Sequence, residues 1–128
     1  MTVGLADTSF FIASESGRPL RAAEVPDRLS VSIVTIAELR AGVLMAADLE
    51  TRDRRLSTLT VALSLDPHPI DDRVAEAWAR LRVAFANASL RMPVNDSWIA
   101  ATAMAHGIPI VTQDDDYVDI PGLAVVRV

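Results

Sequence analysis

The stretch "GLADTSFFIA", residues 4 to 13, is an apolar run that carries a single charge, Asp7. The residues from Val3 to Ala6 have the character of a short buried strand, and those from Thr8 onward have the character of a helix. Asp7 therefore stands where a strand gives way to a helix. An acid there either caps the helix or belongs to a site that needs a carboxylate at the end of a strand. This segment alone leaves both explanations open.

The length and composition predict one globular domain over residues 1–128. Hydrophobic residues make up 51% of the chain and charged residues 23%, as in globular proteins, and a chain of this length buries a core without disulfides. No apolar run approaches the roughly 18 residues of a membrane helix, and the first residues lack the basic start of a signal peptide. Cysteine is absent, which excludes disulfides and thiolate sites. We expect a cytoplasmic protein with no membrane partner.

The charges exclude several kinds of chemistry. All 12 basic residues are arginine, so the chain has no lysine for a P-loop, a Schiff base or a phosphoaspartate site. The net charge of −5 argues against broad, non-specific binding of nucleic acid. It leaves open a nucleic acid that is bound locally through arginine and a metal ion.

Short apolar strands alternate with helices along the chain. Strand character recurs at residues 29–35, 108–112 and 123–128. Helices are expected over residues 35–47, about 49–64, 71–88 and 95–107, the last ending at Gly107. This alternation predicts an α/β fold in which helices flank both faces of a central parallel sheet.

Acidic residues occur at four junctions between these elements: Asp7, Glu38, Asp96 and the run 114–116. Each has an ordinary structural explanation. Asp7 would cap a helix, Glu38 would complete a capping box that begins at Thr35, Asp96 would favour the positive end of its helix, and the aspartate run would form an exposed turn.

Taken together, the four acidic positions favour a ligand-binding site. In an open parallel sheet the strand ends and the following helix starts share one edge, where ligands bind. Carboxylates that converge there repel one another unless a cation neutralises them, and oxygen donors select Mg²⁺ or Mn²⁺.

Four motifs carry a family resemblance: "LADTSFFIA" (5–13), "VTIAELRAG" (34–42), "VNDSWIAATA" (94–103) and "IPIVTQDDDY" (108–117). In this order and at these intervals they resemble the PIN-domain ribonucleases and, more narrowly, the toxin component of VapBC toxin–antitoxin pairs. The resemblance implies a PIN-like three-layer α/β fold and a Mg²⁺-dependent endoribonuclease in which Mn²⁺ can substitute. It also implies a homodimer that a cognate antitoxin neutralises.

The resemblance also implies which acidic residues are catalytic. By motif position Asp7, Glu38 and Asp96 correspond to the first three acids of the family, and Asp114 to the fourth. The neighbouring Asp116 would point the same way as Asp114 in extended backbone, and Asp115 would point away. Whether Asp114 or Asp116 is the fourth acid stays open.

These assignments lead to a mechanism for hydrolysis of an RNA phosphodiester. A metal ion held chiefly by Asp7 and Asp96, with Asp114 and Asp116 as further ligands, would polarise the phosphate and activate a water. Glu38 and Asp114 would complete the outer shell of ligands or position that water.

Substrate contacts are expected from hydroxyls and from one arginine. Thr8, Ser9 and Thr112 would hold waters or phosphate oxygens, although capping explains Thr8 equally well. Arg40 lies two residues after Glu38 and would contact phosphate. The arginines of "TRDRR", residues 51–55, either contact RNA or form an exposed helix face.

Three other classes of protein fit part of this pattern. A phosphoaspartate enzyme of the dehalogenase-like type could use Asp7, but it would need an aspartate at position 9, where Ser9 stands, and a lysine. A catalytically inactive PIN-like interaction module would keep the fold, although retention of all four acids counts against it. A metal nuclease that acts on DNA would have the same site, and only a comparison of substrates would distinguish it.

Overall fold

A computed structural model describes residues 1–117 and 120–128 of the chain. The described residues form a sheet of four strands in the order β2-β1-β3-β4, and every neighbouring pair is parallel. The strands are β1 (Val3–Ala6), β2 (Arg28–Val31), β3 (Ile110–Thr112) and β4 (Val125–Arg127). The helices are α1 (Thr8–Glu15), α2 (Ile33–Leu44), α3 (Leu49–Leu63), α4 (Asp72–Asn87) and α5 (Val94–His106), with a 3-10 turn at Ala22–Glu24.

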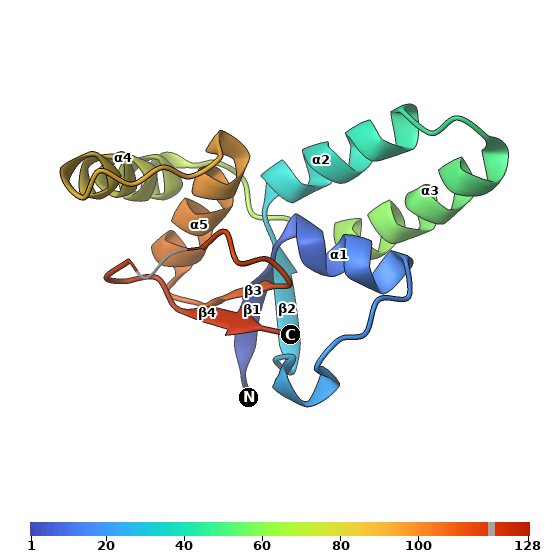
Figure 1. Ribbon diagram of the computed structural model, residues 1–128, viewed down its shortest axis with the longest axis horizontal. Helices are drawn as coiled ribbons and strands as arrows, with labels where there is room; N and C mark the ends of the chain where they lie inside the picture. The colour runs from blue at the N-terminus through green and yellow to red at the C-terminus, as the bar shows by residue number, and fades with distance from the viewer. Residues whose placement is uncertain (118–119) are drawn as a thin grey trace.

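The helices cover both faces of this sheet (Figure 1). Helices α4 and α5 lie together on one side, and α1, α2 and α3 lie on the other, where α2 and α3 run side by side. The predicted α/β fold with a flanked parallel sheet is confirmed. In the part of the chain that the structure describes, no helix is long and apolar enough to cross a membrane.

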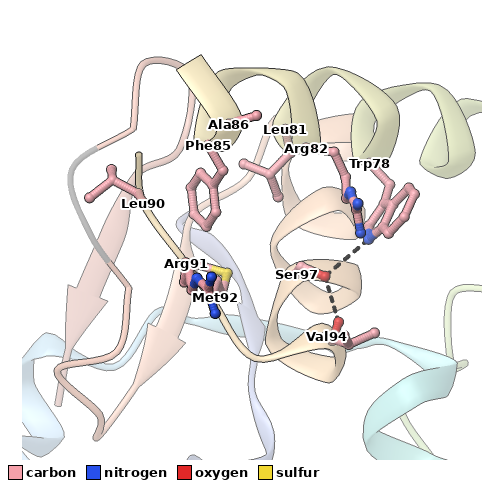
Figure 2. A pocket seen from close by; sticks show the side chains of 10 residues that line it. All are labelled: Trp78, Leu81, Arg82, Phe85, Ala86, Leu90, Arg91, Met92, Val94 and Ser97. Atoms are coloured by element: carbon pink, nitrogen blue, oxygen red, sulfur yellow. Dashed lines mark hydrogen bonds between the residues drawn. The ribbon is translucent and has the colours of Figure 1, made fainter. Parts of the chain in front are cut away.

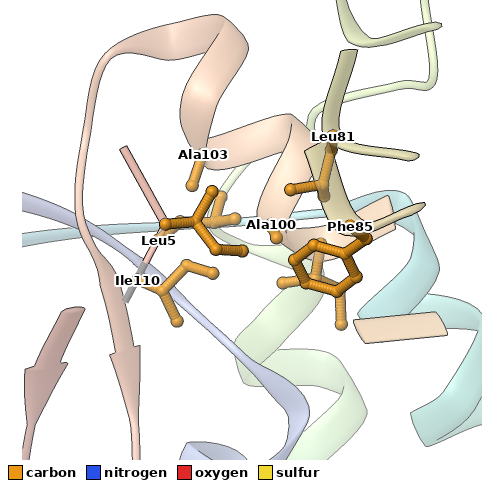
Figure 3. Close-up of a cluster of buried hydrophobic side chains, with 8 residues drawn as sticks. Leu5, Leu81, Phe85, Ala100, Ala103 and Ile110 are labelled. Atoms are coloured by element: carbon orange, nitrogen blue, oxygen red, sulfur yellow. The ribbon is translucent and has the colours of Figure 1, made fainter. Parts of the chain in front are cut away.

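The core has two halves because successive side chains of a strand point to opposite faces of a sheet. On β1, Leu5 belongs to the cluster under α4 and α5, and Ala6 belongs to the cluster under α1, α2 and α3. All the side chains of the first cluster that Figure 3 labels are buried: Leu5, Leu81, Phe85, Ala100, Ala103 and Ile110. Burial on both faces explains why β1 reads as a continuous apolar run.

Helix α4 packs on α5 through an aromatic contact as well as the core. The ring of Trp78 stacks on that of Trp98 with centroids 4.4 Å apart. The Trp78 indole nitrogen Nε1 donates a hydrogen bond to Ser97 Oγ at 3.0 Å (Figure 2). This pair ties α4 to the first turn of α5.

The prediction of a strand over 29–35 is wrong beyond Val31. Ser32 caps α2, because its hydroxyl accepts the backbone N–H of Val34 at 3.0 Å, and the N–H of Ile33 donates to the carbonyl of His68. The β-branched residues after Ser32 therefore form the first turn of a helix, since this cap and burial of Thr35 outweigh their strand preference.

Further predicted bounds are too wide: α2 ends at Leu44 and not at residue 47, β3 begins at Ile110 and not at 108, and β4 covers Val125–Arg127 and not 123–128. Two helix ends agree with the sequence. Helix α3 begins at Leu49 as expected, after Asp48, whose carboxylate accepts the N–H of Thr51 at 2.8 Å. Helix α5 ends at Gly107, which adopts the left-handed conformation with φ 64° that glycine allows. The helix starts at Val94, one residue before the expected position.

Candidate active site

The strand order places a site at the carboxyl edge of the sheet. The chain leaves β1 toward β2 on one side, whereas β3 and β4 lie on the other, so the topology switches between β1 and β3. Ligands of open α/β sheets bind outside such a switch point. Asp7 follows β1 here, and Gln113 follows β3.

Asp7 is held by four polar contacts although it is only 2% exposed. Its Oδ1 accepts the backbone N–H of Phe10 at 3.1 Å and the hydroxyl of Ser9 at 2.7 Å. Its Oδ2 accepts the hydroxyl of Thr112 at 2.6 Å, and its own N–H donates to the Val111 carbonyl at 3.0 Å. Asp7 therefore caps α1 and also contacts the last residue of β3, which a helix cap alone does not require.

The hydroxyls of Ser9 and Thr112 connect Asp7 to the loop after β3. Thr112 Oγ1 accepts the backbone N–H of Asp114 at 2.9 Å, and Ser9 Oγ accepts that of Gln113 at 3.0 Å. Thr112 is fully buried, so its hydroxyl faces Asp7 and not solvent. Burial raises the pKa of the Asp7 carboxyl, although hydrogen bonds from Thr112, Ser9 and Phe10 oppose the rise.

Glu38 lies in the second turn of α2 and does not cap it. The predicted capping box of Thr35 and Glu38 is wrong, because Ser32 caps the helix and Thr35 lies inside it. Glu38 Oε1 instead accepts the hydroxyl of Thr8 at 2.7 Å, across from α1. Asn95 Nδ2, on α5, lies 3.5 Å from Glu38 Oε2. Glu38 thus faces other elements of the site and loses its purely local explanation.

Asp96 lies in the first turn of α5. Burial first, and then the negative charges of Asp116 and Glu38, raise its pKa to about 6. The charges of Asp7 and Asp114 contribute to the same rise. A carboxyl whose pKa is raised by four other carboxylates marks a place where negative charge converges.

The three consecutive aspartates after β3 separate as expected. Asp114 and Asp116 line the same pocket, whereas Asp115 is exposed and pairs with Arg127. Burial and the charge of Asp116 raise the pKa of Asp114, and the guanidinium of Arg18 opposes the rise. The ion pair with Arg127 accounts for the position of Asp115 on the surface.

A pocket of about 370 Å³ gathers these side chains. We call it the acidic pocket, and it is lined by Asp7, Thr8, Ser9, Ile12, Arg18, Glu38, Asp96, Asp114 and Asp116. The carboxylates come from β1–α1, α2, α5 and the loop after β3, segments far apart in the sequence.

The arginine of the acidic pocket is not the one expected. Arg18 lines it, whereas Arg40 is exposed and is not among the lining residues. In the "TRDRR" segment Arg55 donates to the carbonyl of Gly42 at 2.7 Å and Arg54 lies 3.8 Å from Glu15. Those contacts give Arg54 and Arg55 structural roles and so favour the exposed helix face over contact with RNA. Arg18 follows a Ser-Gly break, and no periodicity connects it with the acids.

Tyr117 is, after Arg18, a second residue to which the sequence analysis assigned no role. Its hydroxyl oxygen is buried with no hydrogen-bond partner among the described residues. Burial, and then the charges of Asp7 and Asp96, raise the pKa of Tyr117. The phenol therefore stays protonated beside the carboxylates and keeps a donor to offer.

The donor set of the acidic pocket suits a hard divalent cation. Carboxylate and hydroxyl oxygens are the ligands that Mg²⁺ and Mn²⁺ prefer, and the raised pKa of Asp96 reports a repulsion that a cation would relieve. Within residues 1–117 and 120–128, no three acidic or histidine side chains are already drawn together as a complete metal site.

Comparison with known proteins identifies the family. The profile of the PIN domain matches residues 5–123, which include every carboxylate of the acidic pocket. This chain belongs to the PIN-domain family.

Named relatives and a solved structure agree with this PIN-domain assignment. Ribonuclease VapC5 of Mycobacterium tuberculosis is 47% identical over 125 residues, which cover 98% of this chain and 93% of that protein. Ribonuclease VapC4 of the same organism is 50% identical over 129 residues, with 97% and 95% covered. A chain in the crystal structure of VapBC-5, from the VapBC family of toxin–antitoxin systems of M. tuberculosis, superposes with a TM-score of 0.91 at 41% identity and full coverage of both chains. This PIN domain thus groups with the VapC ribonucleases over nearly its whole length.

Proposed function

We propose that this PIN domain is an endoribonuclease toxin that hydrolyses RNA phosphodiester bonds and is neutralised by a cognate antitoxin. The observation that carries the proposal is the acidic pocket, where Asp7, Glu38, Asp96, Asp114 and Asp116 converge from four segments. Close relatives named ribonucleases, and a relative from a toxin–antitoxin system, support the choice of RNA and of an antitoxin.

The metal ion belongs to this proposal. VapC ribonucleases with a PIN domain generally depend on a divalent metal. We assign Mg²⁺, with Mn²⁺ as a substitute, to Asp7, Asp96, Asp114 and Asp116. When bound, such an ion polarises the phosphate and lowers the pKa of a coordinated water.

The side chains of the acidic pocket divide the remaining tasks. Glu38 and Asp114 orient the attacking water, and Thr8 keeps Glu38 in place through its 2.7 Å hydrogen bond. Ser9 and Thr112 hold Asp7 rather than the substrate, since both hydroxyls contact its carboxylate.

Arginine supplies the phosphate contact in this proposal. Arg18 lines the acidic pocket and takes the part that the sequence suggested for Arg40. We assign Arg40 to a phosphate farther along the RNA strand, because its side chain is exposed outside the acidic pocket.

A paired substitution tests the proposal. The protein should cleave total cellular RNA with Mg²⁺ or Mn²⁺ and stop in the presence of chelator. Asp96→Asn should reduce cleavage at least about a hundredfold, whereas Asp115→Asn should leave it unchanged, because Asp115 points away from the acidic pocket and pairs with Arg127. Equal loss in both variants, or robust cleavage in chelator, would contradict the metal mechanism.

The antitoxin partner gives a cellular test. Expression of the chain alone should arrest growth, and Asp96→Asn should relieve the arrest at equal protein level. A short gene directly upstream that encodes a DNA-binding protein is the expected antitoxin. A folded wild-type protein that leaves growth unaffected would argue against a toxin.

A homodimer also belongs to the proposal. Helix α3 carries exposed apolar side chains that a second copy would cover: Leu56 is 46% exposed and Val61 58%. Light scattering at micromolar concentration should report twice the mass of the chain, and a monomer would refute the dimer. We expect the protein in the cytoplasm, where its RNA substrate and antitoxin are made.

The two remaining alternatives predict other outcomes. A metal nuclease for DNA would cleave a DNA strand of the same sequence faster than the RNA. An inactive interaction module would bind its partner and cleave neither, although nothing in its function would then require the convergence of five carboxylates.

A further inference from the structure

We propose that a second pocket, on the neighbouring face of α5, binds a nucleotide of the RNA strand next to the one that is cleaved. This inference rests on the proposed ribonuclease function and names a substrate subsite for it. The pocket has a volume of about 450 Å³ and lies between α4, the first turn of α5 and residues 90–92 (Figure 2). We call it the arginine pocket, because Arg82 and Arg91 line it.

The arginine pocket combines the two kinds of surface that a nucleotide needs. Phe85, Leu81 and Met92 supply apolar walls for a base. Arg82 and Arg91 supply guanidinium groups, which bind phosphate and stack on bases. The volume lies within the range of small-ligand sites.

Charge favours an anionic occupant. None of the described residues that line the arginine pocket is acidic, although the chain holds 17 acidic residues against 12 basic ones. Within the described residues, neither Arg82 nor Arg91 forms an ion pair with a carboxylate. The guanidinium of Arg82 lies instead 5.0 Å from the centroid of the Trp78 ring, a cation–π contact that orders the side chain.

The position of the arginine pocket connects it with the acidic pocket. Ser97 lines the arginine pocket and Asp96 lines the acidic pocket, on consecutive residues of one helical turn. The two pockets therefore lie on either side of the first turn of α5. In this proposal the RNA strand crosses that turn, with its scissile phosphate at the acidic pocket and a neighbouring nucleotide at the arginine pocket.

A second copy of the chain fits less well in the same place. A symmetric dimer through this face would place the same patch of both copies in one interface, and the described pocket lining offers no carboxylate to pair with its arginines. An acidic protein segment would pair with the arginines but would bring no scissile phosphate to the acidic pocket. An RNA strand satisfies both pockets.

Binding can be measured without cleavage. In protein carrying Asp96→Asn, with Mg²⁺ present, a short fluorescein-labelled single-stranded oligoribonucleotide is titrated and its anisotropy recorded. Adding Arg82→Ala and Arg91→Ala should weaken binding about tenfold. The slope of log K against log salt should shrink by about 1.4, because each phosphate contact on a single strand contributes about 0.7. Arg80→Ala is the matched control, since Arg80 is on the same helix but pairs with Glu76 outside the pocket.

Two further measurements keep the inference falsifiable. The two tryptophans of the chain, Trp78 and Trp98, stack on each other beside the pocket, so the oligoribonucleotide should change their fluorescence in the Arg80→Ala protein and not in the double variant. Ala86→Trp, which fills the pocket from an exposed position, should weaken binding without a change in charge. In the active protein the double arginine variant should raise KM about tenfold and leave kcat unchanged.

The outcomes separate this inference from the proposed function. Unchanged affinity and unchanged KM in the double variant and in Ala86→Trp would overturn the arginine pocket, while loss of cleavage in Asp96→Asn would still support the ribonuclease. A change from dimer to monomer in light scattering, with the affinity for RNA unchanged, would assign this face to a second copy instead. Tight capture of an acidic peptide in place of RNA would also overturn it. Absence of any RNA cleavage by the wild type would reject the proposed ribonuclease. The titration would still show whether the arginine pocket binds the oligoribonucleotide.

Discussion

The two pockets that flank the first turn of α5 have opposite chemistry. The acidic pocket is lined by five carboxylates and a single described arginine, Arg18. The arginine pocket is lined by two arginines, apolar side chains and no described acid. Asp96 and Ser97, which are adjacent in the sequence, line one pocket each. Successive residues of a helix point about 100° apart, so a single turn can serve two different surfaces.

This difference shows how a protein with a net negative charge can bind and cleave RNA, which is also negatively charged. The carboxylates would repel RNA unless a cation lies between them and the phosphate, so the acidic pocket depends on its metal ion. The arginine pocket attracts RNA by itself. The acidic pocket is suited to catalysis and the arginine pocket to binding RNA.

The largest effect is expected on turnover. Asp7→Asn should lower kcat at least about a hundredfold, because the amide cannot supply the charge that a metal ion needs. The fold should survive, since asparagine can still accept the N–H of Phe10 and cap α1. Steady-state cleavage of a labelled RNA, with circular dichroism for folding, measures both. A change in KM with kcat intact would assign Asp7 to binding and break the division between the pockets.

The next effect is stabilisation by metal. Mg²⁺ at about a hundred times its dissociation constant should add roughly 2.7 kcal/mol and raise the melting temperature by about 8 to 15 °C. The double variant Arg82→Ala, Arg91→Ala should show the same rise, whereas Asp96→Asn should show little. Thermal melts with Mg²⁺ and with chelator decide this. If Mg²⁺ shifts none of these proteins, the carboxylates of the acidic pocket serve only as caps and surface charges.

A smaller effect should appear in the pH dependence of the metal-free protein. The pKa of Asp96 rises from 3.8 to about 6 on folding, so the folded state binds more protons and stability falls as pH rises through that interval. Asp96 is partly exposed, so we expect about 1 kcal/mol after solvent screening is allowed for. Melts in chelator should therefore lose less stability between these pH values in Asp96→Asn than in the wild type. An equal loss in both proteins would show that folding does not raise the pKa of Asp96.

The smallest effect concerns the wall of the arginine pocket. Arg82→Ala should reduce the free energy of unfolding by about 0.5 kcal/mol, because it removes the contact with the Trp78 ring. Arg80→Ala should cost about 0.3 kcal/mol or less, since its pair with Glu76 is exposed. Urea unfolding compares the two. A larger cost for Arg80 would mean that Arg82 is not ordered against Trp78.

Much of the acidic pocket could be predicted from the sequence, because its geometry follows from the backbone topology. Parallel strands end at one edge, so acids that follow β1 and β3, and acids near the starts of the neighbouring helices, are expected to lie near one another. This reasoning located Asp7, Glu38, Asp96 and the pair formed by Asp114 and Asp116. Their grouping in one pocket agrees with it.

The arginine pocket could not be predicted in this way. Its arginines belong to an amphipathic helix and to a loop, where charged residues are ordinarily solvated, and the sequence does not say which of them face a pocket. Arg18 was missed in the acidic pocket for the same reason, and Arg40 was preferred because it is close to Glu38 in the sequence. Proximity along the chain is a poor guide for long side chains, whose heads lie where packing leaves room.

The sequence by itself determined the order of the elements, the parallel sheet and the edge at which the carboxylates meet. These follow from short-range preferences and strand pairing, such as the apolar run of β1 and the left-handed turn at Gly107. Only the tertiary structure decided that Ser32 rather than Thr35 caps α2, that Trp78 stacks on Trp98, and that the rings of His68 and His106 stack 4.0 Å apart. The two ring stacks join side chains on separate elements. They depend on how helices pack over the sheet, which the local pattern of residues does not encode.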